Sequence, residues 1–222
     1  MIDKLAETLE NFSNNAIESQ KEIDLLMKDV LKTGKMNPFI KSEVMQQYIK
    51  QPGFIFVSVE VMVLREAWIR NYSHALWCDE ATDLVLGYSK DIVGVGSGSG
   101  FIEYLLQRAG ADIVASDISA YKYWDYPYLN VEKLTSVDAV KKYPGKDLFL
   151  CWPSYGVSWA YDTIRALESG RYVFYIGEPN GCTGDKEFYK YINDKGCFER
   201  IDGYRIPQWF GFHDCLMIYR KK

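Results

Sequence analysis

Histidine and closely paired cysteine are scarce in this sequence, and their scarcity narrows the chemistry open to it. The 222 residues include 2 histidines and 5 cysteines, and no two cysteines form a C-x-x-C pair. The cysteines are widely spaced, at positions 78, 151, 182, 197 and 215. This pattern indicates neither a disulfide framework nor a zinc site, and it suits a reducing compartment.

Long apolar runs and basic clusters are also missing. The longest apolar stretch, residues 54–64, contains Ser58 and Glu60 and is far shorter than the ~20 residues of a membrane-spanning helix. The first ten residues carry three acids and no apolar segment of a signal peptide, so we expect a cytoplasmic protein without a membrane partner. The net charge is −4 and the densest basic run is residues 220–222, which disfavours duplex nucleic acid as a partner.

The composition is that of a soluble globular domain. Hydrophobic residues make up 48% and charged residues 25% of the chain, and 222 residues suit one domain with a full core. Aromatic residues are frequent at 15%, with 17 tyrosines and 6 tryptophans. They indicate either a tyrosine-rich core and surface or a pocket for a flat substrate, and composition leaves both open.

Residues 1–33 are predicted to be helical, because apolar residues recur at alternating three- and four-residue steps. Such a pattern can form a coiled coil, through which two copies of the chain would make a homodimer. Asn14-Asn15 followed by Glu18 instead resembles a helix stop and a new N-cap. We therefore favour two helices packed as a cap on the core.

The rest of the chain alternates between strand and helix patterns. Residues 1–40 are assigned to the N-terminal helical segment and residues 41–222 to the main domain. Residues 41–86 read as mostly helical apart from a β-branched run at 54–57. Strands are expected at 92–95, 112–116, 131–134, 147–152, 171–177, 198–203 and 214–219, and helices at 80–86, 101–108, 156–167 and 185–193. This alternation predicts an α/β protein whose mostly parallel sheet carries helices on both faces.

The most informative segment is residues 91–117, DIVGVGSGSGFIEYLLQRAGADIVASD. An expected strand enters the glycine-rich loop 96–100, a helix and a second strand follow, and the segment ends at Asp117. This order is half of a nucleotide-binding βαβ unit. The glycines allow a tight turn and close approach to a ligand, and a carboxylate at the tip of the second strand can hold both hydroxyls of a ribose.

The glycine spacing distinguishes between ligands. The dinucleotide pattern G-x-G-x-x-G could begin at Gly94 or at Gly96, and it fits at neither. Its last glycine would fall on Ser99 in the first case and on Phe101 in the second. The G-x-G-x-G spacing instead resembles motif I of the class I S-adenosylmethionine-dependent methyltransferases. The resemblance implies S-adenosylmethionine as cofactor, with its ribose bound by Asp117 and the adjacent Ile118. It also implies that the loop contacts the amino-acid part of the cofactor, through Gly94, Gly96, Ser97, Gly98 and Gly100.

Two further segments follow expected strands, at the edge where open α/β sheets bind ligands. Asp138, in Ser-Val-Asp-Ala, resembles the family's adenine-binding acid, and a helix N-cap is the alternative. Residues 151–155, Cys-Trp-Pro-Ser-Tyr, resemble motif IV of methyltransferases that act on amino groups, and an ordinary proline turn is the alternative. The motif implies that Cys151 lies beside the cofactor and that the acceptor lies beside three residues: Trp152, Pro153 and Tyr155.

The sequence departs from the family pattern at two positions. Gly94 stands where motif I usually begins with an acid, and Trp152 stands where motif IV has Asp, Asn or Ser. A contact at the methionine end is therefore missing or supplied elsewhere, and amine methylation is in doubt because an indole accepts no hydrogen bond. Glu178, after the fifth expected strand, is a candidate base or orienting group, or else a turn carboxylate that caps the next helix.

Residues 75–222 also resemble a methyltransferase-like family of fungi and viruses with Cys-Trp-Pro-Pro-Tyr, Gly-Cys-Thr-Gly-Asp and Pro-Gln-Trp signatures. Both resemblances imply a Rossmann-like class I methyltransferase fold with a seven-stranded sheet and an added N-terminal helical cap. The implied activity is direct methyl transfer to a small or planar acceptor, among which an amino group is one candidate. The alternative is a non-catalytic protein that binds an adenosyl ligand or a partner, and a nicotinamide-dependent oxidoreductase is a distant third.

Overall fold

The core of the protein is a twisted seven-stranded sheet with the order β3-β2-β1-β4-β5-β7-β6. The computed structural model describes residues 2–49, 59–119, 127–179 and 181–222, so the β-branched run expected at 54–57 lies outside the described residues. Only β7 runs antiparallel to its neighbours, which confirms the expected mostly parallel sheet. The strands are β1 (Asp91–Val95), β2 (Asp112–Ser116), β3 (Val131–Glu132), β4 (Asp147–Cys151), β5 (Tyr172–Gly177), β6 (Phe198–Tyr204) and β7 (Cys215–Lys221).

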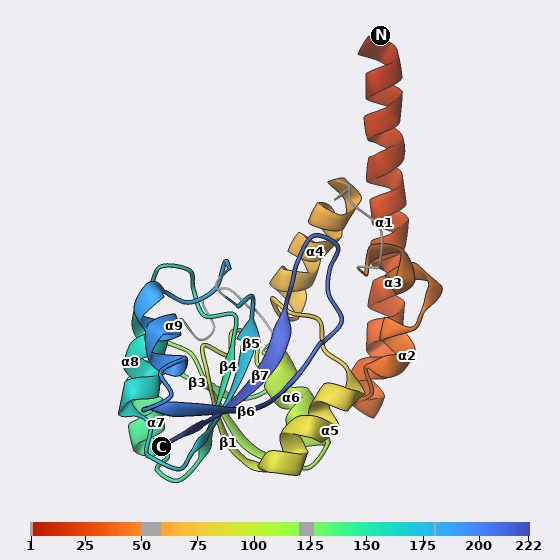
Figure 1. The fold of residues 1–222 in the computed structure, drawn as a ribbon. Coiled ribbons are helices and arrows are strands. Elements are labelled where there is room, and N and C mark those ends of the chain that lie inside the picture. The colour runs from red at the N-terminus through yellow and green to blue at the C-terminus, as the bar shows by residue number, and fades with distance from the viewer. Residues whose placement is uncertain (1, 50–58, 120–126, 180) are drawn as a thin grey trace.

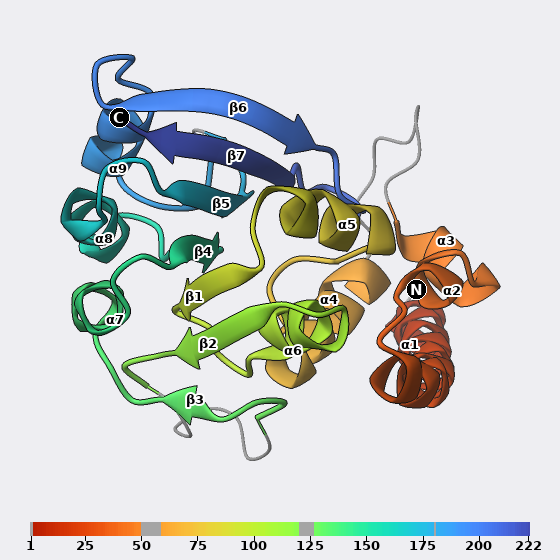
Figure 2. The ribbon, with the colours of Figure 1, turned by 90° about the horizontal axis from the view of Figure 1, so that it is seen from below.

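Helices cover both faces of this sheet (Figure 2). One face carries α4 (Val59–Asn71), α5 (Asp79–Tyr88) and α6 (Phe101–Arg108), and the other carries α7 (Ser136–Lys142), α8 (Trp159–Ala166) and α9 (Lys186–Ile192). Successive strand side chains alternate between the two layers. Phe149 of β4 packs with the first group, for example, and Leu148 and Leu150 pack with the second. After their first residues, Asp91 and Asp147, the central strands β1 and β4 are apolar, as suits strands with both faces buried.

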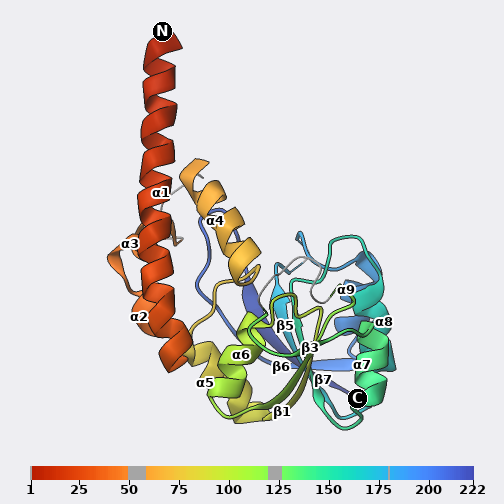
Figure 3. The ribbon, with the colours of Figure 1, turned by 180° about the vertical axis from the view of Figure 1, so that it is seen from behind.

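The N-terminal segment differs from its prediction. A single 32-residue helix, α1 (Ile2–Thr33), replaces the expected pair, and its N-terminal half extends away from the sheet (Figures 1 and 3). Asn14 and Asn15 lie exposed on it. Because Asn costs only a few tenths of a kcal/mol more than Ala in an exposed helix, and no Gly or Pro interrupts the segment, the helix continues. The homodimer alternative stays a prediction.

The C-terminal half of α1 is anchored to the domain. It packs beside α2 (Asn37–Ile40), α3 (Glu43–Tyr48) and α4, and it buries Ile23 and Met27 to 1% exposure each. The Tyr104 hydroxyl of α6 donates to the carbonyl of Leu31 at 2.6 Å. One apolar cluster therefore spans the sequence boundary expected at residue 40. Within the described residues, no helix has the length and apolar character needed to cross a membrane.

Several boundaries also differ from the prediction. β3 has two residues instead of the expected four, and Gly87 lies inside α5 instead of ending it. The sequence pattern missed α7, which begins because the Thr135 side chain accepts a hydrogen bond from the backbone N–H of Asp138 at 3.1 Å. A short helix with few apolar positions gives little periodicity, so its cap is the stronger signal.

Candidate functional site

A cavity of about 560 Å³ lies at the C-terminal ends of β1, β2 and β4. Its volume falls in the range of about 300–1,000 Å³ that is typical of small-molecule sites. Segments that are distant in sequence contribute to its wall. The lining residues are Tyr72–His74, Gly96–Ser99, Phe101–Glu103, Asp117–Ser119, Leu134–Val137, Cys151, Trp152, Ser154, Trp159 and Asp162.

The glycine loop lies against the cavity as a tight turn. Gly96 and Gly98 have φ angles of 62° and 56°, in the left-handed region that other residues rarely adopt. A Cβ at Gly96 would also come within 2.8 Å of the Trp159 ring, which lies across the loop. Gly100 caps the start of α6 and is not part of the cavity wall. Glycine at 96 is therefore required both by the backbone and by the close approach of an aromatic ring.

Asp117 connects this loop to the end of β2. One carboxylate oxygen accepts a hydrogen bond from the N–H of Gly98 at 3.0 Å, and the other accepts from the N–H of Ser119 at 2.6 Å. Each carboxylate oxygen can accept a second hydrogen bond, so the same group can both hold the loop and bind ligand hydroxyls. The adjacent Ile118 is 64% exposed and forms an apolar part of the cavity wall.

The segment after β3 reaches the cavity through Leu134–Val137, and Asp138 lies one residue beyond this lining. The Asp138 carboxylate accepts a hydrogen bond from the Thr135 hydroxyl at 2.6 Å. Thr135, and not Asp138, is the N-cap of α7. An adenine contact by Asp138 stays a prediction, whereas Thr135 and Ser136 already face the cavity.

Glu103 is a cavity residue that was not predicted from the sequence. It is 3% exposed, on the first turn of α6. Burial raises the pKa of Glu103 to about 7, the negative charge of Asp117 adds to the rise, and a hydrogen bond with Ser97 opposes it. The sequence did contain one sign of this site. Glu103 is the single acid in residues 101–106, FIEYLL, a helical stretch that is otherwise mostly apolar.

Trp152 has the one left-handed φ angle, 51°, recorded for a non-glycine residue in the described part of the chain. Such a conformation costs roughly 1–2 kcal/mol and is found preferentially at functional sites. The indole is held on two sides: its Nε1 donates to Asp214 at 2.8 Å, and its ring stacks on His74 at 5.6 Å. Trp152 therefore presents a fixed flat surface to the cavity.

Two buried charged residues, Arg65 and Asp214, lie close to this aromatic wall. The guanidinium of Arg65 lies 3.7 Å from the centroid of the Phe212 ring and 5.0 Å from that of Trp152. Burial raises the pKa of Asp214 to about 7, and the Trp152 hydrogen bond opposes the rise. Burial, reinforced by the nearby Arg65 charge, lowers the pKa of His74. These surroundings favour the neutral form of the His74 imidazole. The position of His74 on the cavity wall gave no signal in the sequence.

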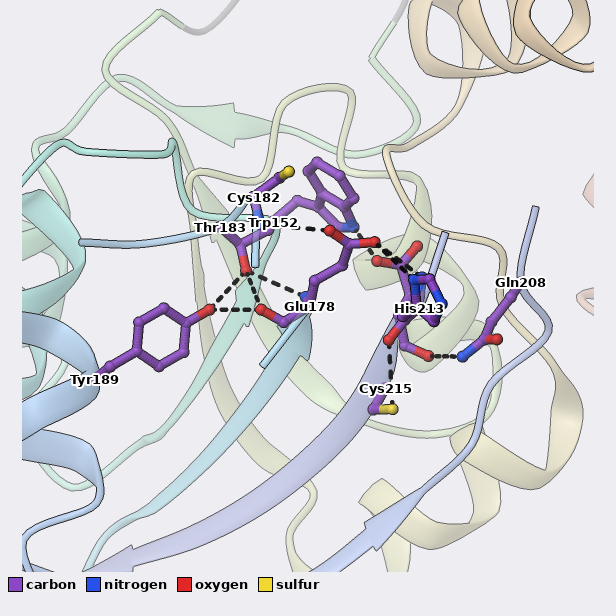
Figure 4. Close-up of polar contacts among 9 residues, drawn as sticks. Trp152, Glu178, Cys182, Thr183, Tyr189, Gln208, His213 and Cys215 are labelled. Carbon is purple, nitrogen blue, oxygen red and sulfur yellow. Dashed lines mark hydrogen bonds and ion pairs between the residues drawn. The ribbon is translucent and has the colours of Figure 1, made fainter. Parts of the chain in front are cut away.

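Glu178 lies outside the cavity wall and fastens two loops (Figure 4). One carboxylate oxygen accepts from the N–H of His213 at 2.9 Å, and the other accepts from the N–H of Cys182 at 3.3 Å. The next helix, α9, is capped by Asp185 instead. Glu178 therefore orients the loops on either side of Trp152, and a role as a base stays a prediction.

Three other residues of the segment 151–155 have different places: one lines the cavity and two lie outside it. Cys151 lines the cavity, and burial raises the pKa of its thiol well above the ordinary value. Pro153 is buried behind the wall, where its carbonyl accepts from the N–H of Gly184 at 2.8 Å. Tyr155 is 73% exposed and borders a separate shallow hollow with Asp185.

The structure thus brings together one part of the predicted set. Seven predicted residues line the cavity, and six lie behind or beside it. The first group is Gly96, Ser97, Gly98, Asp117, Ile118, Cys151 and Trp152; the second is Gly94, Gly100, Asp138, Pro153, Tyr155 and Glu178.

No protein-family model and no curated protein matches the sequence. Solved structures of similar fold include a SAM-dependent methyltransferase from Anabaena variabilis, with 7% identity and a TM-score of 0.48 over 65% of this chain and 83% of that chain. The N-methyltransferase NodS from Bradyrhizobium japonicum has 9% identity and a TM-score of 0.44 over 64% and 93%. An rRNA methylase from Streptococcus thermophilus has 16% identity and a TM-score of 0.39 over 64% and 95%. At such identities the similarity concerns the fold alone.

Proposed function

We propose that this protein is an S-adenosylmethionine-dependent methyltransferase acting on a small or planar acceptor. The observation that carries the proposal is one cavity in which the glycine loop, Asp117 and the Trp152 surface meet. The loop and the carboxylate suit an adenosyl ligand, and the indole suits a second, flat molecule. When bound, the cofactor supplies a methyl group already activated by a positively charged sulfur.

The residues of the cavity fit the cofactor. Asp117 retains acceptor capacity for the two ribose hydroxyls, and Ile118, Leu134 and Val137 offer apolar contacts for an adenine ring. The close approach of Trp159 to the loop at Gly96 limits the thickness of a group that lies there. A cavity of about 560 Å³ accommodates one such nucleoside and a small acceptor.

The acceptor side depends on orientation more than on a strong base. Trp152 is fixed by its hydrogen bond to Asp214 and by its stack on His74. Because its surroundings favour the neutral form, the His74 imidazole can accept a hydrogen bond from the group that is methylated. A planar acceptor stacked on Trp152 would be held close to the methyl donor with water excluded from that face.

Binding and transfer are tested separately. Thermal unfolding should show the wild-type protein stabilised by S-adenosylmethionine and S-adenosylhomocysteine, by about 5–10 °C at a ligand concentration ~100 times the Kd. NAD at the same concentration should have no effect. Gly98→Val should still unfold cooperatively, at a somewhat lower temperature because Val is strained at a φ of 56°, and it should lose the ligand response because its side chain adds bulk to the cavity wall. Absence of any response in the wild type would refute the proposal.

Methyl transfer is then measured with radiolabelled cofactor and a cell extract, with Gly98→Val as the inactive control. Label recovered in small molecules supports the proposed acceptor class. The second candidate function is a non-catalytic adenosyl-ligand or partner-binding protein. Trp152 favours this second candidate. Its indole N–H already donates to Asp214, and an indole has no atom that could accept a hydrogen bond from the substrate to be methylated. Binding without transfer would establish this second candidate.

A further inference from the structure

Glu103 occupies space that a side chain at position 94 would otherwise fill. Gly94 lies in β1, and a Cβ built there would be 2.7 Å from Oε1 of Glu103 and 2.9 Å from its Cγ. Real Cβ atoms do not approach other atoms so closely, so a side chain at 94 and the observed Glu103 exclude each other. The carboxylate of Glu103 therefore reaches, from α6, the place beside β1 that the glycine leaves open.

This buried carboxylate has no cationic partner in the described part of the chain. None of the ion pairs there includes Glu103, whose side-chain hydrogen bond is with the neutral Ser97. The charged group that acts on it is Asp117, which has the same sign, and Cys151 is the other titratable group facing it. Burying a carboxylate is costly unless it is paired, and Glu103 lines the cavity, so a ligand can provide the missing positive charge.

We infer that Glu103 binds the ammonium group at the amino-acid end of the adenosyl cofactor, in place of an acid at position 94. The inference rests on the proposed function and adds to it a residue and a ligand group. Asp117 and Glu103 then divide the cofactor between them. Asp117 binds the ribose, and Glu103 binds the cationic end on the other side of the glycine loop.

The test uses two ligands that differ only at this end. S-adenosylhomocysteine carries the amino-acid group, and 5′-methylthioadenosine has the same nucleoside without it. In calorimetric titrations, Glu103→Gln should weaken S-adenosylhomocysteine binding about 10- to 100-fold, the range for loss of a charge-assisted hydrogen bond. Binding of 5′-methylthioadenosine should stay within about twofold of the wild type, which also shows that the variant is folded.

Asp117→Asn is the matched control, because it also removes one cavity carboxylate. It should weaken both ligands to a similar extent, since both contain the ribose. A Glu103→Gln variant that weakens both ligands equally, or neither, overturns the inference and leaves the proposed function standing. A wild-type protein that binds neither ligand overturns the proposed function itself, and the inference with it.

A second pair of variants tests the exchange of positions directly. Gly94→Glu alone should reduce binding and stability, since its side chain collides with Glu103 and adds a like charge. The double variant Gly94→Glu/Glu103→Ala removes the collision and returns a carboxylate to β1. It should bind S-adenosylhomocysteine at least tenfold more tightly than Glu103→Ala alone. Equal affinities of these two variants would contradict the inference.

Discussion

The stability of the free protein is expected to decrease as the pH rises from 5 to 8, with Glu103 as one cause. Burial raises the pKa of this carboxyl from its ordinary value of 4.5 to about 7. The folded state thus holds the proton more tightly than the unfolded chain. The resulting stabilisation is fully present below about pH 4.5 and is lost as the pH rises through about 7.

The size of the effect follows from these two values. At 1.36 kcal/mol per pKa unit, a change from 4.5 to about 7 corresponds to roughly 3 kcal/mol of unfolding free energy. About 2–3 kcal/mol of it is lost between pH 5 and pH 8. Asp214 adds a contribution of the same sign, since burial raises its pKa from 3.8 to about 7.

Urea unfolding, followed by tryptophan fluorescence at pH 5, 6, 7 and 8, measures the effect. Glutamine at position 103 cannot ionise. Between pH 5 and pH 8 the unfolding free energy of the wild type should therefore fall by about 2–3 kcal/mol more than that of Glu103→Gln. Asp214→Asn should remove the second contribution, and Glu187→Gln, at an exposed position on α9, should follow the wild type. Parallel profiles for the wild type and Glu103→Gln would refute the assignment of a buried carboxyl with a raised pKa at position 103.

Three further outcomes are expected. Asp117→Ala should weaken S-adenosylmethionine binding by about 1.5–3 kcal/mol in calorimetry, and wild-type affinity would contradict its role at the ribose. Met27→Ala should lower the unfolding free energy by about 2–5 kcal/mol, because Met27 is 1% exposed, whereas Leu25→Ala on the same helix, 62% exposed, should change it by less than about 0.5 kcal/mol. Trp152→Ala should reduce methyl transfer about 10- to 100-fold, because stacking is lost. Tyr155→Ala should stay nearer the wild type, because Tyr155 lies outside the cavity. A larger loss in Tyr155→Ala than in Trp152→Ala would instead place the acceptor in the shallow hollow beside Tyr155.

Local sequence was sufficient for most of the sheet and for half of the site. The strands, the glycine loop and Asp117 are neighbours along the chain, and a parallel βαβ unit places them together whatever the rest of the molecule does. The length of α1 was the main local error, because two exposed asparagines resemble a cap although they are tolerated within a helix. The fold class could be predicted because the alternation of strand and helix patterns along the chain matches the elements that form.

The acceptor side depended on contacts between residues far apart in the chain. Trp152 and Asp214 are separated by 62 residues, and His74 reaches the cavity from the loop after α4. No spacing rule links such positions, since their distance is decided by how helices and loops pack over the sheet edge.

The exchange between Gly94 and Glu103 shows the same division most sharply. The sequence by itself determined that β1 ends without the usual acid and that α6 begins with a carboxylate in an apolar stretch. Only the tertiary structure places the Glu103 carboxylate in the space beside Gly94, and so connects the missing acid with the buried one. A Cβ at position 94 would lie 2.7 Å from Oε1 of Glu103, so Glu103 of α6 takes the place beside β1 that the glycine leaves open.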